Sequence, residues 1–148
     1  MFEPDLSLQK PLEDFIELFE NSNPRAMDLL DAVSSVSLAL EDPYLKVQGR
    51  ESVKSLWKTR FSLHQGGRYK VHDFSWGRRE ATAYIKWSFL FKPKRKKKLF
   101  SKNAVEEERS FDAMSQLSFL PNGQIFSIVD FWGIHDGFNI HEYAVTEI

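Results

Sequence analysis

The sequence of 148 residues contains no cysteine. Disulfide bonds and thiolate metal sites are therefore excluded, and cysteine usage gives no information about the redox compartment. The formal net charge is only −1, so no overall field directs the chain to nucleic acid or to a membrane surface. No apolar run approaches the about 18 residues of a transmembrane helix. The N-terminal residues lack the basic and apolar regions of a secretory signal, and we expect a cytoplasmic protein without a membrane span.

The histidines do not form a recognisable metal site. His64, His72, His135 and His141 show neither an HxH nor an HExxH spacing, and no cysteine is present to complete a ligand set. Surface or turn positions are the simpler interpretation for all four. The sequence therefore implies no metal ion and no organic cofactor.

Flat apolar side chains, in contrast, are abundant. Aromatic residues make up 14% of the sequence and include 13 Phe and 4 Trp. A single domain of this length buries about 70% of the surface of its unfolded chain. The composition is therefore sufficient for one hydrophobic core together with an apolar cavity, and we predict a single domain over residues 1–148.

Periodicity predicts helices first and longer strands afterwards. Apolar residues at helical spacing indicate three helices, over residues 12–19, 24–31 and 51–63. We expect a short strand at 36–40 and four longer strands at 69–76, 81–91, 110–120 and 125–132. Helices that precede a meander of strands are typical of an α+β domain. Residues 1–10 are predicted to form a loosely held arm.

The segment VSLALEDPYLKVQG, residues 36–49, predicts a candidate carboxylate site. Its strand ends in Glu41 and Asp42, and Pro43 stops the strand because proline cannot donate to the sheet ladder. A carboxyl at an apolar strand end has a raised pKa through desolvation and is suited to accept a proton. Asp42 is therefore a candidate general base. The alternative is that Asp42 accepts hydrogen bonds from the backbone N–H groups of the turn.

A basic run, KPKRKKK, extends from Lys92 to Lys98. It opens a long excursion over residues 92–109, which also contains Glu106 to Glu108. The simpler interpretation is a solvated hairpin tip that keeps the sheet edge from pairing. The alternative is that the basic residues contact phosphates of nucleic acid or anionic lipid head groups. No aromatic residue interleaves the lysines, which argues against binding to single-stranded nucleic acid.

Two motifs, LEDPYLKVQG and LPNGQIFSIVDFW, together with the order of elements, resemble the nuclear transport factor 2-like superfamily. The resemblance covers roughly residues 12–132 and is nearest to the SnoaL-like and ketosteroid isomerase-like members. It implies a cone, in which a curved antiparallel sheet wraps three N-terminal helices and leaves an apolar pocket. It also implies a homodimer formed across the sheet. It does not specify an activity, because this fold hosts many.

The resemblance implies only part of a ketosteroid isomerase site. The general base of that family corresponds to Asp42. The position of its oxyanion tyrosine falls on Phe15, and that of its protonated aspartate falls on Ser115. A phenyl ring cannot donate a hydrogen bond, and loss of one such donor costs about 10²–10³-fold in rate. True steroid isomerisation is therefore not expected.

A second carboxylate, Asp130, lies in the last predicted strand. Alternation places its side chain on the face that the resemblance makes the inner one. If Asp42 and Asp130 face one cavity, they can share a proton or hold a water molecule. The alternative is that Asp130 is hydrogen-bonded elsewhere, for example to Arg50 or Arg60. A slip of one residue in strand register would exchange Asp130 for its neighbour.

These observations predict a binding protein for a small apolar molecule, with an isomerase- or cyclase-like proton transfer at Asp42 and Asp130. The predicted ligand wall consists of Phe15, Phe19, Tyr44, Trp57, Trp87, Ser115 and Trp132. For each aromatic residue of this wall, plain core packing is the alternative. The alternative function is a non-catalytic dimeric interaction module whose basic hairpin contacts a partner.

Overall fold

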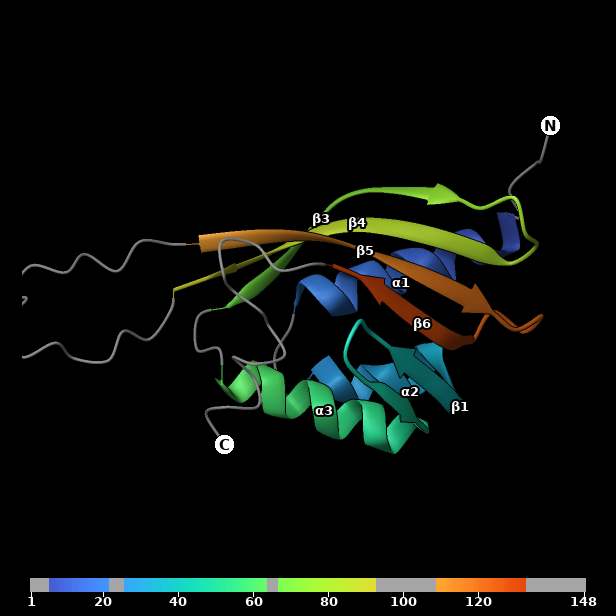
Figure 1. Ribbon diagram of the computed structural model, residues 1–148. Helices are drawn as coiled ribbons and strands as arrows, with labels where there is room; N and C mark the ends of the chain where they lie inside the picture. The colour runs from blue at the N-terminus through green and yellow to red at the C-terminus, as the bar shows by residue number, and fades with distance from the viewer. Residues whose placement is uncertain (1–5, 22–25, 64–66, 93–108, 133–148) are drawn as a thin grey trace, which may run out of the picture.

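The computed structural model describes residues 6–21, 26–63, 67–92 and 109–132. A curved sheet forms one layer, and the helices lie against one of its faces (Figure 1). Within the described residues, no helix has both the length and the hydrophobicity of a membrane span. Most of the predicted basic excursion, residues 93–108, lies outside the described residues.

The helices differ from the prediction mainly at their ends. A 3₁₀ turn, Leu6–Leu8, leads into α1, Gln9–Glu20. The expected loose arm is therefore wrong for residues 6–10, because Leu8 is buried and holds this end of the chain against the core. The second helix is a 3₁₀ turn, Ala26–Leu29, followed by the single turn α2, Leu30–Val33. The third, α3, spans Arg50–Leu63.

The six strands form one mixed sheet in the order β2-β1-β6-β5-β4-β3. Their bounds are β1 Ser34–Glu41, β2 Lys46–Gln48, β3 Arg68–Trp76, β4 Thr82–Phe91, β5 Arg109–Phe119 and β6 Ile125–Phe131. Neighbouring strands are antiparallel except β1 and β6, which are parallel. The predicted sheet was antiparallel throughout. The difference arises because β1 and β6 are not consecutive strands: β2, α3, β3, β4 and β5 lie between them in the chain. No hairpin therefore forces β1 and β6 to run antiparallel.

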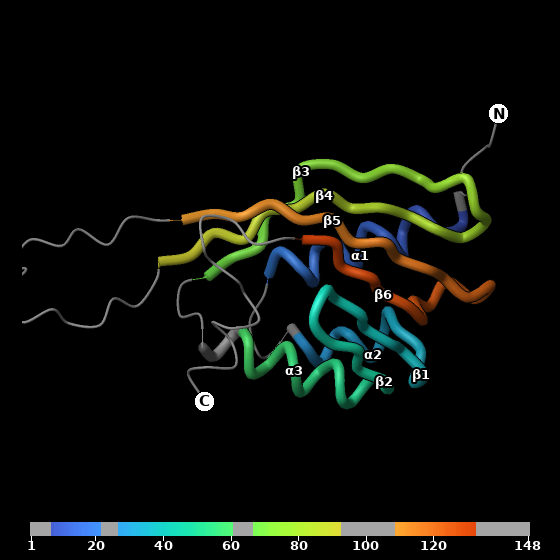
Figure 2. The backbone as a smooth tube through the Cα atoms, in the orientation of Figure 1, coloured from blue at the N-terminus to red at the C-terminus, as the bar shows by residue number. Residues whose placement is uncertain are grey.

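Breaks in strand register accompany the curvature of the sheet. The β3–β4 ladder shifts between Val71 and Asp73, and the β5–β6 ladder shifts between Ser118 and Phe119. An extra residue in one strand bends that strand and increases its twist. The sheet consequently curves around the helices without closing, as the backbone trace shows (Figure 2).

The core lies between the inner face of the sheet and helices α1 and α3. Fully buried side chains alternate along the strands, as expected for strands with one covered face. They include Leu38, Leu40, Ile85, Leu117 and Ile128. The α+β architecture predicted from the sequence is thus confirmed, with three helices on one side of a curved, open sheet.

Gly49 sets the connection from β2 into α3. Its φ of 98° lies in the left-handed region, which residues with a Cβ atom rarely adopt. The Gly49 N–H donates to the carbonyl of Leu38 at 2.8 Å, and the Gly49 carbonyl accepts the first helical hydrogen bond, from Val53, at 3.0 Å. This turn brings α3 back across the end of β1, where Asp42 lies.

Candidate functional site

Asp42 lies directly after β1, and both of its carboxylate oxygens are engaged. Oδ1 accepts hydrogen bonds from the backbone N–H groups of Tyr44 and Leu45, at 2.8 and 2.9 Å. Oδ2 accepts from Nη2 of Arg60 at 2.8 Å. The structure thus contains the backbone hydrogen bonds of the non-catalytic alternative, together with an ion pair. A catalytic role for Asp42 stays a prediction.

The Asp42–Arg60 ion pair is almost completely removed from solvent. The side chain of Asp42 has no exposed surface, and that of Arg60 is 5% exposed. Nε of Arg60 is buried and has no hydrogen-bond partner among the described residues. Buried polar atoms in native proteins are nearly always satisfied by protein, water or ligand. The guanidinium therefore brings an unused donor into the interior.

A chain of hydrogen bonds across three strands holds Asp130 of β6. Nε1 of Trp87, in β4, donates to Oγ of Ser115, in β5, at 2.8 Å. Oγ of Ser115 donates in turn to Oδ1 of Asp130 at 2.5 Å. An indole N–H can only donate, so the serine hydrogen is directed to the aspartate. Oδ1 is therefore an acceptor, and a proton that binds Asp130 binds at Oδ2.

Oδ2 of Asp130 makes no hydrogen bond with any residue in the described part of the chain. Burial raises the pKa of Asp130 to about 6, against the hydrogen bond from Ser115 and the charge of Arg60, which lower it. The negative charge of Asp42 raises it further. Asp130 is therefore a carboxyl that gains and loses a proton near neutral pH, and no other described residue occupies the exchanging oxygen.

Tyr69, in β3, belongs to the same neighbourhood. Burial raises the pKa of its phenol to about 12, with the charge of Arg60 opposing and that of Asp130 adding to the shift. The hydroxyl therefore keeps its proton at neutral pH. Asp130, Arg60 and Tyr69 thus form a polar cluster inside an aromatic environment.

The predicted ligand wall divides into an interior part and a rim. Phe15, Phe19, Trp57, Trp87 and Ser115 are buried. Their rings pack face to edge or tilted, with centroids 5.3–6.4 Å apart in the pairs Phe15–Trp57, Phe19–Trp57 and Phe19–Trp87. These contacts also serve the core, so a ligand-contacting role for the aromatic residues stays a prediction.

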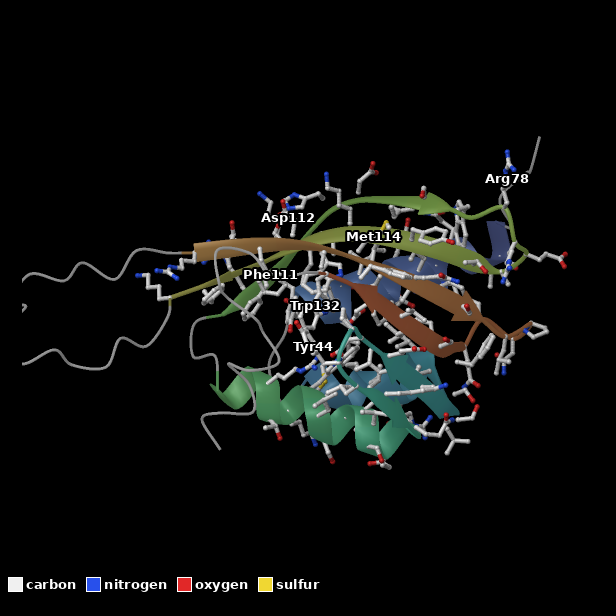
Figure 3. All side chains as sticks on the ribbon, viewed as in Figure 1. Tyr44, Arg78, Phe111, Asp112, Met114 and Trp132 are labelled. Atoms are coloured by element: carbon white, nitrogen blue, oxygen red, sulfur yellow. The ribbon has the colours of Figure 1, made fainter. Side chains whose placement is uncertain are left out.

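The rim lies where the ends of β1 and β6 meet. The rings of Tyr44 and Trp132 lie 5.4 Å apart, and Phe111 lies 6.3 Å from Trp132 (Figure 3). Tyr44 is 44% exposed, unlike the interior part of the wall. The aromatic residues therefore extend from the core to the surface at this end of the sheet.

Two members of the cluster, Arg60 and Tyr69, were not among the predicted site residues. Arg60 follows Val53 and Trp57 at the spacing i, i+4 and i+7, and so lies on the buried face of α3. A charged residue on an apolar helix face was the signal for it. Tyr69 carried no such signal, because a tyrosine at an inward-facing position of a strand is as typical of core packing as of a polar site.

The described residues contain no group of three side chains suited to hold a metal ion. His72 lies on the outer face of the sheet, with Nε2 2.6 Å from Oγ of Ser88. Ser88 in turn donates to Oδ1 of Asp112 at 2.5 Å. The other three histidines, His64, His135 and His141, lie outside the described residues.

Comparison with solved structures identifies the fold. The chain superposes with an NTF2-like protein of unknown function from Exiguobacterium sp. 255-15 (TM-score 0.66, 15% identity, 84% of this chain and 99% of the other). It also superposes with a steroid delta-isomerase from Pseudomonas aeruginosa (0.70, 11%, 99% and 95%). A third similar structure is the epoxide hydrolase/cyclase-like enzyme SalBIII, described in pyran ring formation in salinomycin (0.65, 16%, 85% and 92%).

No protein-family model matches the sequence, and no curated protein matches it significantly. The structural similarity at these low identities concerns the fold. The protein therefore has the nuclear transport factor 2-like fold, as the two sequence motifs predicted, and its chemistry must be argued from its own residues.

Proposed function

We propose that the protein binds a small apolar molecule against the inner face of its sheet and transfers a proton at Asp130, as in an isomerase- or cyclase-type reaction. The observation that carries this proposal is that two polar atoms of the interior have no hydrogen-bond partner among the described residues: Oδ2 of Asp130, and Nε of Arg60, whose charge lowers the pKa of Asp130. A bound polar group of a ligand would satisfy both atoms. The names of the similar structures, an isomerase and a cyclase-like enzyme, are consistent with this class.

The proposed step moves one proton. Asp130, ionised, removes a proton from carbon beside a carbonyl group of the ligand, and the proton is held on Oδ2. The electron pair of the broken C–H bond moves to the carbonyl oxygen, and Nε of Arg60 donates a hydrogen bond to that oxygen. Return of the proton to another atom of the ligand completes an isomerisation. In this proposal Asp42 acts as the counterion that positions Arg60, and Asp130 takes the role of base that the sequence predicts for Asp42.

The proposal is tested by exchange of carbon-bound hydrogen for deuterium. The apolar ketone 2-tetralone is incubated with the protein in deuterated buffer, and loss of its α-proton signal is followed by NMR. We expect the wild-type protein to exchange the α-protons faster than buffer alone. In Asp130→Asn the acceleration over buffer should be about 10²–10⁴-fold smaller. Asp112→Asn, a substitution on the outer face of β5, is the matched control and should leave it unchanged. Exchange at the buffer rate with the wild-type protein contradicts the proposal.

We also propose that two copies associate through the outer face of the sheet. Met114 and Phe131 are register partners on this face and are 41% and 48% exposed. Exposed apolar patches on soluble proteins commonly mark interfaces. Sedimentation equilibrium should give a dimer for the wild-type protein and a monomer for the double substitution Met114→Lys and Phe131→Lys. A wild-type monomer at all concentrations would exclude the dimer. The expected cytoplasmic location stays a prediction.

A further inference from the structure

A concave site lies between α1 and the edge strand β3, away from the interior cluster. Its volume is about 650 Å³, within the range of ligand and peptide sites. The residues that line it are Glu13, Ile16, Glu17, Glu20, Asn21, Val71, His72, Asp73 and Phe74. It shares no residue with the polar cluster of Asp130, Arg60 and Tyr69, and it does not include Asp42. Strand β3 ends the sheet on this side (Figure 1).

The floor of this groove is apolar and accessible. Phe74 is the register partner of the buried Ile85 and so faces the helices, yet it is 38% exposed. Ile16 and Val71 are partly buried beside it. An aromatic ring that faces inward but is not covered by the described chain can receive one apolar side chain from outside.

The rim of the groove is acidic. Glu13, Glu17 and Glu20 recur along one face of α1, over a rise of about 10 Å. All three side chains are exposed. Within the described residues, none of the three carboxylates forms a salt bridge. No Lys or Arg lines the groove, so no cation of the groove lining compensates these three charges. Asp73 also lines the groove, but it is the register partner of Lys86, which pairs with the outward-facing Met114, so its side chain faces the other side of the sheet.

We infer that this groove binds a short basic segment of another protein, with one apolar side chain on Phe74 and flanking Lys or Arg side chains against the carboxylates. Charge complementarity with an apolar anchor is the combination that such a segment offers. About three residues of an extended peptide span the 10 Å from Glu13 to Glu20 along α1.

The basic run of the chain itself lies outside the described residues apart from Lys92. Whether this run occupies the groove is decided by the test below. The same run from a second copy would join two different surfaces, a head-to-tail contact that tends to form open chains.

The test uses the full-length protein and a fluorescently labelled peptide, Lys-Lys-Phe-Lys-Lys. Binding is measured by anisotropy at low ionic strength, where rim charges act most strongly. We expect saturable binding that weakens with salt, and weaker binding of Lys-Lys-Ala-Lys-Lys. The double substitution Glu17→Gln and Glu20→Gln should weaken binding about three- to tenfold. Glu80→Gln, an exposed carboxylate in the β3–β4 turn, is the matched control and should leave the affinity unchanged.

Three results would overturn the inference. The first is equal affinity of the wild-type protein and the Glu17→Gln, Glu20→Gln variant. The second is an equal loss in Glu80→Gln, which would indicate non-specific attraction. The third is binding that occurs only after Lys94 to Lys98 are replaced by Gln, which would identify the run of the chain itself, or of a second copy, as the occupant. Both Glu17 and Glu20 are exposed, so the variant should fold, and circular dichroism checks this.

Discussion

The buried carboxyl of Asp130 should make the stability of the protein depend on pH in a direction opposite to that of an ordinary salt-bridged acid. The pKa of Asp130 is raised from 3.8 to about 6, chiefly by burial. Between these two values the folded state holds more protons than the unfolded state. The free energy of unfolding therefore falls as the pH rises through this window, and the full penalty is present above about pH 6.

The size of the effect follows from the two pKa values. The difference between 3.8 and about 6 corresponds to about 3 kcal/mol of free energy of unfolding. Most of it, about 2 to 3 kcal/mol, develops between pH 4 and pH 7. Substitution of Asp130 by Asn keeps an oxygen that accepts from Ser115 but removes the titration. The variant should therefore gain stability relative to the wild-type protein as the pH rises.

Urea denaturation of both proteins at a series of pH values measures this difference directly. All other titrating groups are common to the two chains, so their contributions cancel in the comparison. A difference in unfolding free energy between Asp130→Asn and the wild-type protein that stays constant from pH 4 to pH 7 would refute the reasoning. A difference that changes with the opposite sign would show that Asp130 is stabilised in its ionised form.

Three further substitutions test neighbouring contacts. Ser115→Ala removes the hydrogen bond that lowers the pKa of Asp130, so this pKa should rise above about 6. The pKa is read from the pH dependence of the difference in unfolding free energy between the Ser115→Ala protein and the same protein carrying Asp130→Asn. An unchanged pKa would exclude this role of Ser115. Asp42→Asn leaves the buried Arg60 unpaired and should cost about 3–5 kcal/mol in urea unfolding, whereas the double variant with Arg60→Met should recover part of the loss, and equal stability of both variants would argue against a buried charge. Gly49→Ala must adopt a φ of 98° and should cost about 1–2 kcal/mol; no loss of stability would mean that the turn rearranges.

The sequence predicted well those features that depend on local pattern. Val53 and Trp57 located α3. Strand alternation together with the resemblance placed Asp130 on the inner face, and the resemblance indicated Ser115; both are buried. The short strand β2, Lys46–Gln48, was missed because three residues are too few to show a period. Helix ends were also displaced, since 3₁₀ turns precede both α1 and α2.

The parts of the site that the sequence did not predict are tertiary contacts. The ion pair of Asp42 joins residues 18 positions apart on different elements. The spacing along α3 places Arg60 on the buried helix face but does not indicate that this arginine reaches the turn at Asp42. The same holds for the Trp87–Ser115–Asp130 chain, which depends on three strands meeting in register. The candidate residues could thus be named from the sequence, while their protonation and their partners required the structure.

The carbon-13 chemical shift of the Asp130 side-chain carboxyl, followed by NMR across the pH range and assigned with the Asp130→Asn variant, tests the central claim most directly. We predict a single titration with a midpoint near pH 6, the value to which burial raises this pKa. A midpoint near that of a solvent-exposed aspartate, about 3.9, would contradict the account, because burial would then not raise the pKa of Asp130 and this carboxyl would not exchange its proton near neutral pH.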